Sequence, residues 1–127
     1  MASSNYGPYD VQSFVAAVDL DSKAGFFGKI TASGLDLAGA GERADGVIVN
    51  VERSGAGATI GLMTTSGRKV PVAASAAISV GAQMGSAAGG KGATAASGDV
   101  INGIAVDSAS ADNDLVTCLF GYQGAKA

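Results

Sequence analysis

Gly46-Val47-Ile48-Val49-Asn50-Val51 is the stretch that decides the fold class of this chain. Its β-branched side chains fit a pleated, half-buried strand better than a helix. Glycine-rich breaks stand on both sides of it, at Gly39-Ala40-Gly41 and at Ser54-Gly55-Ala56-Gly57. A short apolar run between two turn signals predicts a β-strand.

The same pattern of short apolar runs and small-residue breaks continues outward in both directions. It predicts strands at Gln12–Val18, Gly25–Thr31, Gly46–Glu52, Ala58–Thr64, Arg68–Ala74, Ala82–Ser86, Val100–Asp107 and Leu115–Gly121. Thr65-Ser66-Gly67 predicts a short hairpin between two of these strands. Only Ala73–Ile78 could form a helical turn. We therefore predict an all-β chain, a small β-barrel or β-sandwich with short Gly-rich turns.

A weak internal repeat relates the two halves of the chain. Leu35–Met63 aligns without gaps to Gly92–Phe120, about 57 residues later, a spacing long enough for a supersecondary unit. Gly46/Gly103 and Leu62/Leu119 are among the identical pairs. Small residues are abundant enough to produce such matches by chance. Two interpretations stay open: coincidence, or two related β-units within one domain.

The composition predicts a folded domain with a thin core. The chain has 127 residues and a net charge of only -3. Ala, Gly and Ser make up about 46% of it, whereas Leu, Ile, Val and Phe reach about 22%, just above the level typical of disordered chains. A small domain with little large apolar surface tends to need burial against partners. We expect an arm at residues 1–10, a single β-domain at residues 11–121 and a tail at residues 122–127.

Charge and hydropathy exclude several classes of partner. The sequence pI is about 4.6, and only Arg68-Lys69 are adjacent basic residues. Nucleic-acid binding, which requires a basic surface, is therefore not expected. The sequence contains neither a long apolar run for a membrane span nor a signal-peptide pattern. We expect a soluble protein.

The residue inventory argues against catalysis, metal binding and cofactors. The chain has no histidine, the commonest general base and metal ligand. Its one cysteine, Cys118, lies in an apolar strand-like run, which predicts a buried free thiol. Two acidic pairs, Asp19 with Asp21 and Asp112 with Asp114, are expected in solvated turns. The second pair lacks the glycine and the later glutamate of a calcium loop.

Gly85-Ser86-Ala87-Ala88-Gly89-Gly90-Lys91-Gly92 matches seven of the eight positions of a phosphate-binding loop. The eighth position requires Ser or Thr for magnesium, and Gly92 stands there. The residues that follow, Ala93–Gly98, are too broken to form the helix that such a loop needs. We reject a nucleotide site.

The N-terminal segment, residues 1–10, reads as an extended arm because it is small, polar and interrupted by Gly7-Pro8. The default interpretation is an unpaired terminus. The alternative is an arm that orders on a neighbouring protein, since tyrosine is common at interfaces. The candidate partner-binding residues are Asn5, Tyr6, Pro8 and Tyr9.

Several turn and strand signatures carry a resemblance to a known family. They are Ala24-Gly25-Phe26-Phe27, residues 41–47 (Gly-Glu-Arg-Ala-Asp-Gly-Val), residues 77–81, residues 90–99, Gly103-Ile104-Ala105-Val106 and residues 112–116. In these, residues 19–120 resemble the small bacteriophage capsid decoration (cement) proteins. Some members of that family are labelled RecA/RadA-like recombinases, a label that the failed phosphate loop does not support. The resemblance implies a compact β-domain of β-tulip type, often trimeric, bound over capsomer junctions and without catalytic residues.

We therefore expect a structural protein of the virion that is made in the bacterial cytoplasm. It would bind the major capsid protein on the outer surface of the shell and stabilise the head against DNA pressure. The alternative is a receptor- or glycan-binding β-domain on a virion or cell surface, which would need an exposed aromatic platform. The chain has three Tyr, four Phe and no Trp to build one. A hydrolase using Asp or Ser would lack a base.

Overall fold

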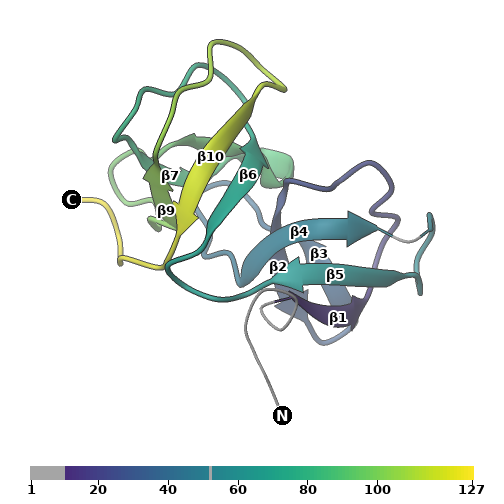
Figure 1. Cartoon of the computed structure of the whole chain (residues 1–127). Helices are drawn as coiled ribbons and strands as arrows, with labels where there is room; N and C mark the ends of the chain where they lie inside the picture. Colours follow the sequence, from purple (N-terminus) through teal and green to yellow (C-terminus); the bar gives the residue numbers. More distant parts are fainter. Residues whose placement is uncertain (1–10, 52) are drawn as a thin grey trace.

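Two five-stranded antiparallel sheets, one from each half of the chain, make up the computed structural model, which describes residues 11–51 and 53–127 (Figure 1). Sheet 1 consists of β1 (Val11–Val15), β2 (Phe27–Thr31), β3 (Gly34–Leu37), β4 (Gly46–Val51) and β5 (Thr59–Met63). Sheet 2 consists of β6 (Lys69–Ala73), β7 (Gln83–Ser86), β8 (Gly92–Thr94), β9 (Gly103–Ala105) and β10 (Leu115–Phe120). The prediction of an all-β fold is confirmed. Neither sheet closes into a barrel, so the sandwich alternative describes it better.

The two sheets have the same strand order. Sheet 1 runs β1-β5-β4-β2-β3 and sheet 2 runs β6-β10-β9-β7-β8, so each strand corresponds to the strand five places later. One parallel bridge brings the edges of each sheet together, Ala16 with Leu35 and Ala74 with Gly92. Each half of the chain is therefore a strongly curled sheet of one topology.

The registers give the residue equivalence between the two sheets. Val47 pairs with Met63 in sheet 1, and Ile104 pairs with Leu119 in sheet 2. With Gly46 matched to Gly103, Met63 therefore corresponds to Leu119. The gapless alignment paired Leu62 with Leu119 instead. That difference of one residue matters because it moves a side chain to the other face of a strand.

Two apolar cores stabilise the molecule. The first lies inside sheet 1, where Leu35, Ile48 and Leu62 are fully buried and belong to one cluster with Phe26. The second lies inside sheet 2 and includes Val72, Met84, Val116 and Cys118. Sheet 1 contributes Phe27, Val47 and Met63 to this second core. The consecutive Phe26 and Phe27 thus place one ring in each core, since successive residues of an extended chain face opposite ways.

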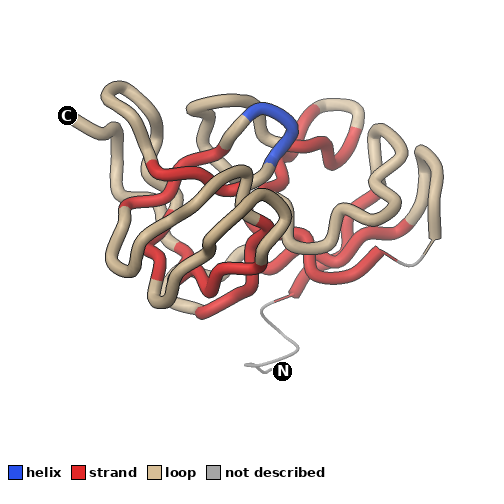
Figure 2. Tube along the Cα trace, turned by 90° about the horizontal axis from the view of Figure 1, so that it is seen from above, coloured by secondary structure: helices blue, strands red, loops and turns tan. Residues whose placement is uncertain are grey.

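Loops occupy much of the chain between the short strands (Figure 2). Asn102 fixes one of them across the two halves. Its buried side chain accepts a hydrogen bond from the Ala44 N–H at 3.0 Å and donates one to the Glu42 carbonyl at 3.1 Å. The C-terminal tail is also held, because Ile101 N–H donates to the Gly124 carbonyl and Lys126 N–H donates to the Asp99 carbonyl.

Three local predictions need correction. Thr65-Ser66-Gly67 does not close a hairpin: β5 and β6 belong to different sheets, and the turn carries the chain from one to the other. Residues 73–78 form no helical turn, because Ala74 and Ile78 make β-bridges. The one short helix among the described residues is the 3₁₀ turn η2 (Ala88–Gly90). Strands β3 and β8 were not predicted.

Candidate binding surface

The thiol of Cys118 is enclosed in the core of sheet 2. Cys118 is fully buried between its neighbours on β6 and β9, Val70 and Ala105. Burial raises the pKa of this thiol to about 12, because the apolar surroundings disfavour the thiolate. Since the thiolate is the nucleophile, the geometry gives Cys118 a packing role.

We therefore expect Cys118 to resist alkylation in the folded protein. At pH 8, iodoacetamide should label it at least about a hundredfold more slowly than in guanidinium, because the native thiol stays protonated and enclosed. The same raised pKa predicts that stability, complete below pH 9, falls as the pH rises towards 12, because the unfolded thiol ionises first. Mass spectrometry of labelled samples measures the first effect. Rapid stoichiometric labelling of the native protein would contradict the buried position.

One aspartate of each acidic pair, Asp19 and Asp114, stabilises a loop by accepting hydrogen bonds. Asp19 accepts hydrogen bonds from the N–H groups of Gly55 and Asp21, at 2.9 and 3.0 Å, and these bonds lower its pKa. Asp114 accepts bonds from the hydroxyl and N–H of Ser110 and from the Ala111 N–H, and its pKa is also lowered, chiefly by Ser110. No group of three metal-ligating side chains occurs within residues 11–51 and 53–127.

The segment that resembles a phosphate loop forms a β-hairpin. Its residues run through the end of β7 and the η2 turn into β8, so a strand stands where a nucleotide loop needs a helix. Lys91, which would contact phosphate, forms an ion pair with Asp112 at 2.9 Å. The structure therefore does not bring these residues into an anion cradle.

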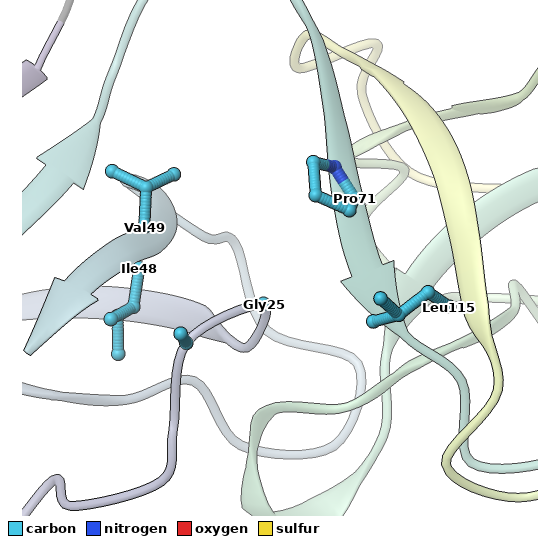
Figure 3. A pocket seen from close by; sticks show the side chains of 6 residues that line it. Gly25, Ile48, Val49, Pro71 and Leu115 are labelled. Atoms are coloured by element: carbon cyan, nitrogen blue, oxygen red, sulfur yellow. The ribbon is translucent and has the colours of Figure 1, made fainter.

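An apolar pocket opens where the two sheets meet (Figure 3). Ile48 and Val49 of β4 line one wall, Pro71 of β6 and Leu115 of β10 line the other, and Gly25 lies between them. Ala24 completes the lining. The pocket holds about 300 Å³, and none of its lining side chains is charged.

Local backbone features create this pocket. The β4–β5 register shifts between Ile48 and Asn50, and this bulge leaves Val49 on the surface. Pro71 stands on β6, an edge strand of sheet 2, where a missing N–H is tolerated. Gly25, at φ +90°, donates its N–H to the Ile48 carbonyl and accepts the Ala73 N–H at 2.9 Å. The Gly25 turn therefore ties sheet 1 to sheet 2 at the floor of the pocket.

Leu115 makes the pocket a candidate binding surface. Its side chain is 63% exposed, although it is among the largest apolar residues of the chain. Leu119 points from the same strand face and is also exposed. Exposed apolar side chains beside a concave apolar pocket are typical of sites that bind another protein. The sequence alone does not reveal this site, because its residues come from four separate segments.

The N-terminal candidates Asn5, Tyr6, Pro8 and Tyr9 lie outside the described residues. Among the aromatic residues within the described ranges, Phe26, Phe27 and Phe120 are buried. Tyr122 is exposed, and the Arg43 guanidinium lies 4.7 Å from its ring centre. No helix in the described ranges is long and apolar enough to span a membrane. No protein-family model matches the chain, and no curated protein matches it significantly.

Proposed function

We propose that this protein is a non-enzymatic capsid decoration protein that binds the outer surface of a bacteriophage shell and reinforces it. The observation that carries a binding role is the apolar pocket beside the exposed Leu115. The choice of a capsid as the partner rests on the family resemblance of residues 19–120. The protein would act as a homo-oligomer, a trimer by the same resemblance, on the major capsid protein.

The pocket suits the insertion of an apolar side chain from the shell. Burying such a group contributes about 25 cal/mol for each Å² of apolar surface removed from water. One contact of this size is weak, but subunits joined in an oligomer bind neighbouring sites with a high effective concentration. Many modest contacts around the shell would then resist the outward pressure of packaged DNA.

The receptor- or glycan-binding alternative receives less support from the described residues. Sugar-binding surfaces stack rings against exposed aromatic side chains. Here three phenylalanines are buried, and Tyr122 is engaged by Arg43. An aromatic platform is therefore not formed by the part of the chain that the structure describes.

Leu115→Lys should weaken shell binding. The charge would stand at the mouth of the apolar pocket and would have to lose its hydration on binding, so we expect at least about a tenfold loss of affinity. Co-sedimentation of purified protein with expanded, undecorated capsids measures it. The matched control is Val18→Lys, at an exposed apolar residue outside the pocket.

The wild-type protein should also copurify with intact virions at a fixed ratio to the major capsid protein. Virions without it should release DNA at a lower temperature. Absence from virions, or unchanged heat stability of shells that lack it, would overturn the capsid assignment. Equal binding by Leu115→Lys and wild type would overturn the role of the pocket.

A further inference from the structure

Sheet 1 contains a row of four opposed residues of which three are buried, and the equivalent row in sheet 2 is partly exposed. Directly opposed positions in sheet 1 form the Met63 row: Val11, Met63, Val47 and Phe27. The corresponding positions in sheet 2 form the Leu119 row: Lys69, Leu119, Ile104 and Gln83. Because opposed residues share a face of a sheet, each row marks the outer face of its sheet.

The two rows differ in what covers them. Met63 is 5% exposed, and Val47 and Phe27 are fully buried, because sheet 2 packs over the Met63 row. Leu119 is 37% exposed, and Ile104 beside it is half-buried. The Leu119 row therefore has an apolar centre like that of the Met63 row, but no third sheet covers it.

The ends of the Leu119 row have a polar character that the Met63 row lacks. Lys69 takes the place of Val11, and Gln83 takes the place of the Phe27 ring. Gln83 accepts a hydrogen bond from the Lys126 ammonium at 2.8 Å. An apolar centre with a polar rim is the usual construction of a surface that binds and releases a protein partner.

The contact between the two sheets within one chain indicates which surface would fit on the Leu119 row. Two backbone hydrogen bonds, here called the corners of the contact, lie at its sides: Ala73 N–H donates to the Gly25 carbonyl, and Gly41 N–H donates to the Ser86 carbonyl. Ala73 and Ser86, on sheet 2, correspond to Val15 and Ile30 on sheet 1. Val15 and Ile30 are 58% and 47% exposed. Sheet 1 thus has exposed apolar residues at the positions equivalent to those through which sheet 2 contacts sheet 1.

Gly25 and Gly41 are the residues of sheet 1 that bond to sheet 2, so their equivalents on sheet 2 are the positions that would bond to a second copy. Gly81 matches Gly25, because the Gly25 N–H donates to the Ile48 carbonyl of β4 and the Gly81 N–H donates to the equivalent Ala105 carbonyl of β9. Val80, next to Gly81, is 67% exposed. Gly98 matches Gly41, but its N–H donates to the Lys126 carbonyl of the tail. One corner is therefore open, and the C-terminal tail occupies the other.

We propose that the Leu119 row, with Val80 at its open corner, binds the sheet 1 end of a second copy of this chain. Val15 and Ile30 of the second copy would dock as sheet 2 docks on sheet 1 within one chain. The contact is head-to-tail, and such contacts close into a ring when the rotation between copies permits. The inference concerns the free protein and does not depend on the shell.

Two single variants test the contact from its two sides. Leu119→Lys places a charge on the row, and Val15→Lys places one on the opposite end. Each should raise the dissociation constant for self-association roughly thirtyfold, the effect of removing an interface hot spot. Analytical ultracentrifugation of the full chain over a range of concentrations measures it. The control is Ala88→Lys, at an exposed position of η2 outside both proposed contact faces, which should self-associate like the wild type.

Mixing the two variants distinguishes a head-to-tail contact from a symmetric one. Each variant keeps one intact end, so an equal mixture should form a dimer of twice the 12.2 kDa chain mass and nothing larger. A wild-type chain that stays monomeric at all concentrations would overturn the inference. So would a mixture that stays monomeric, or an Ala88→Lys variant that loses self-association equally. Capsid binding is absent from this assay, so a negative result would remove the self-association surface, whereas the co-sedimentation experiment with capsids tests shell binding separately.

Discussion

Phe27→Ala should lower the free energy of unfolding by about 3–5 kcal/mol, the range measured when large buried aromatic residues are truncated. The Phe27 ring is fully buried and leaves sheet 1 to join the core of sheet 2, where it approaches Val72 and Met84. Its removal costs apolar burial and leaves a cavity at the contact between the two sheets. Domains of this size have only about 5–15 kcal/mol of stability, so the loss is a large part of the total.

Urea denaturation followed by circular dichroism measures this effect. Phe14→Ala is the matched control, because Phe14 on β1 is only partly buried against the core of sheet 1. We expect a clearly smaller loss there. A Phe27→Ala variant within about 1 kcal/mol of the wild type, well below the usual cost of such a cavity, would show that the two sheets do not depend on this ring.

The position of Phe27 also shows what the sequence could and could not reveal. Apolar runs with β-branched residues predicted β4 nearly to its ends, because local pattern and burial agree there. The same pattern could not assign Phe26 and Phe27 to different cores. Strands β3 and β8 escaped prediction because they are short and begin at Gly34 and Gly92. They form through pairing with β2 and β7, and propensity alone does not reveal such pairing.

The wrong hairpin at Thr65-Ser66-Gly67 has the same origin. Met63 pairs with Val11, and Lys69 pairs with Leu119, so both strands beside the turn take distant partners. A turn signal specifies a change of direction without specifying which strands then pair. Sheet membership is decided by contacts far apart in the chain.

The candidate binding surface was hidden for a related reason. The run Leu115–Phe120 is apolar at nearly every position, which is typical of a buried strand. In the structure Val116, Cys118 and Phe120 face the core, whereas Leu115 and Leu119 face outward. Apolar residues on both faces of an antiparallel strand were a signal of a second contact surface. Its pocket required residues 24–25, 48–49 and 71 as well, and only the fold brings them together.

Gly103→Ala should lower the free energy of unfolding by about 2–3 kcal/mol, the upper part of the range for overpacking. A Cβ atom at Gly103 would lie 2.5 Å from the Cys118 sulfur and 2.6 Å from the Leu119 carbonyl oxygen. The carbonyl belongs to the paired strand β10, so relief requires the β9–β10 ladder to move. Glycine inside a strand often marks such a close approach.

Gly46 provides a test of whether this glycine has an equivalent in the other half. A Cβ atom there would lie 2.5 Å from the Met63 carbonyl oxygen and 2.7 Å from Leu62, the residues that correspond to Leu119 and Cys118. Gly46→Ala should therefore cost a similar amount. Gly121→Ala is the control, because its Cβ would meet only Ser66 at an ordinary 3.8 Å. Equal urea midpoints for all three variants would contradict the steric account. A loss of stability in the Gly46→Ala and Gly103→Ala variants alone would mean that the geometry shared by the two sheets requires glycine at both positions. The Gly46/Gly103 identity in the internal repeat would then not be a coincidence of the high glycine content.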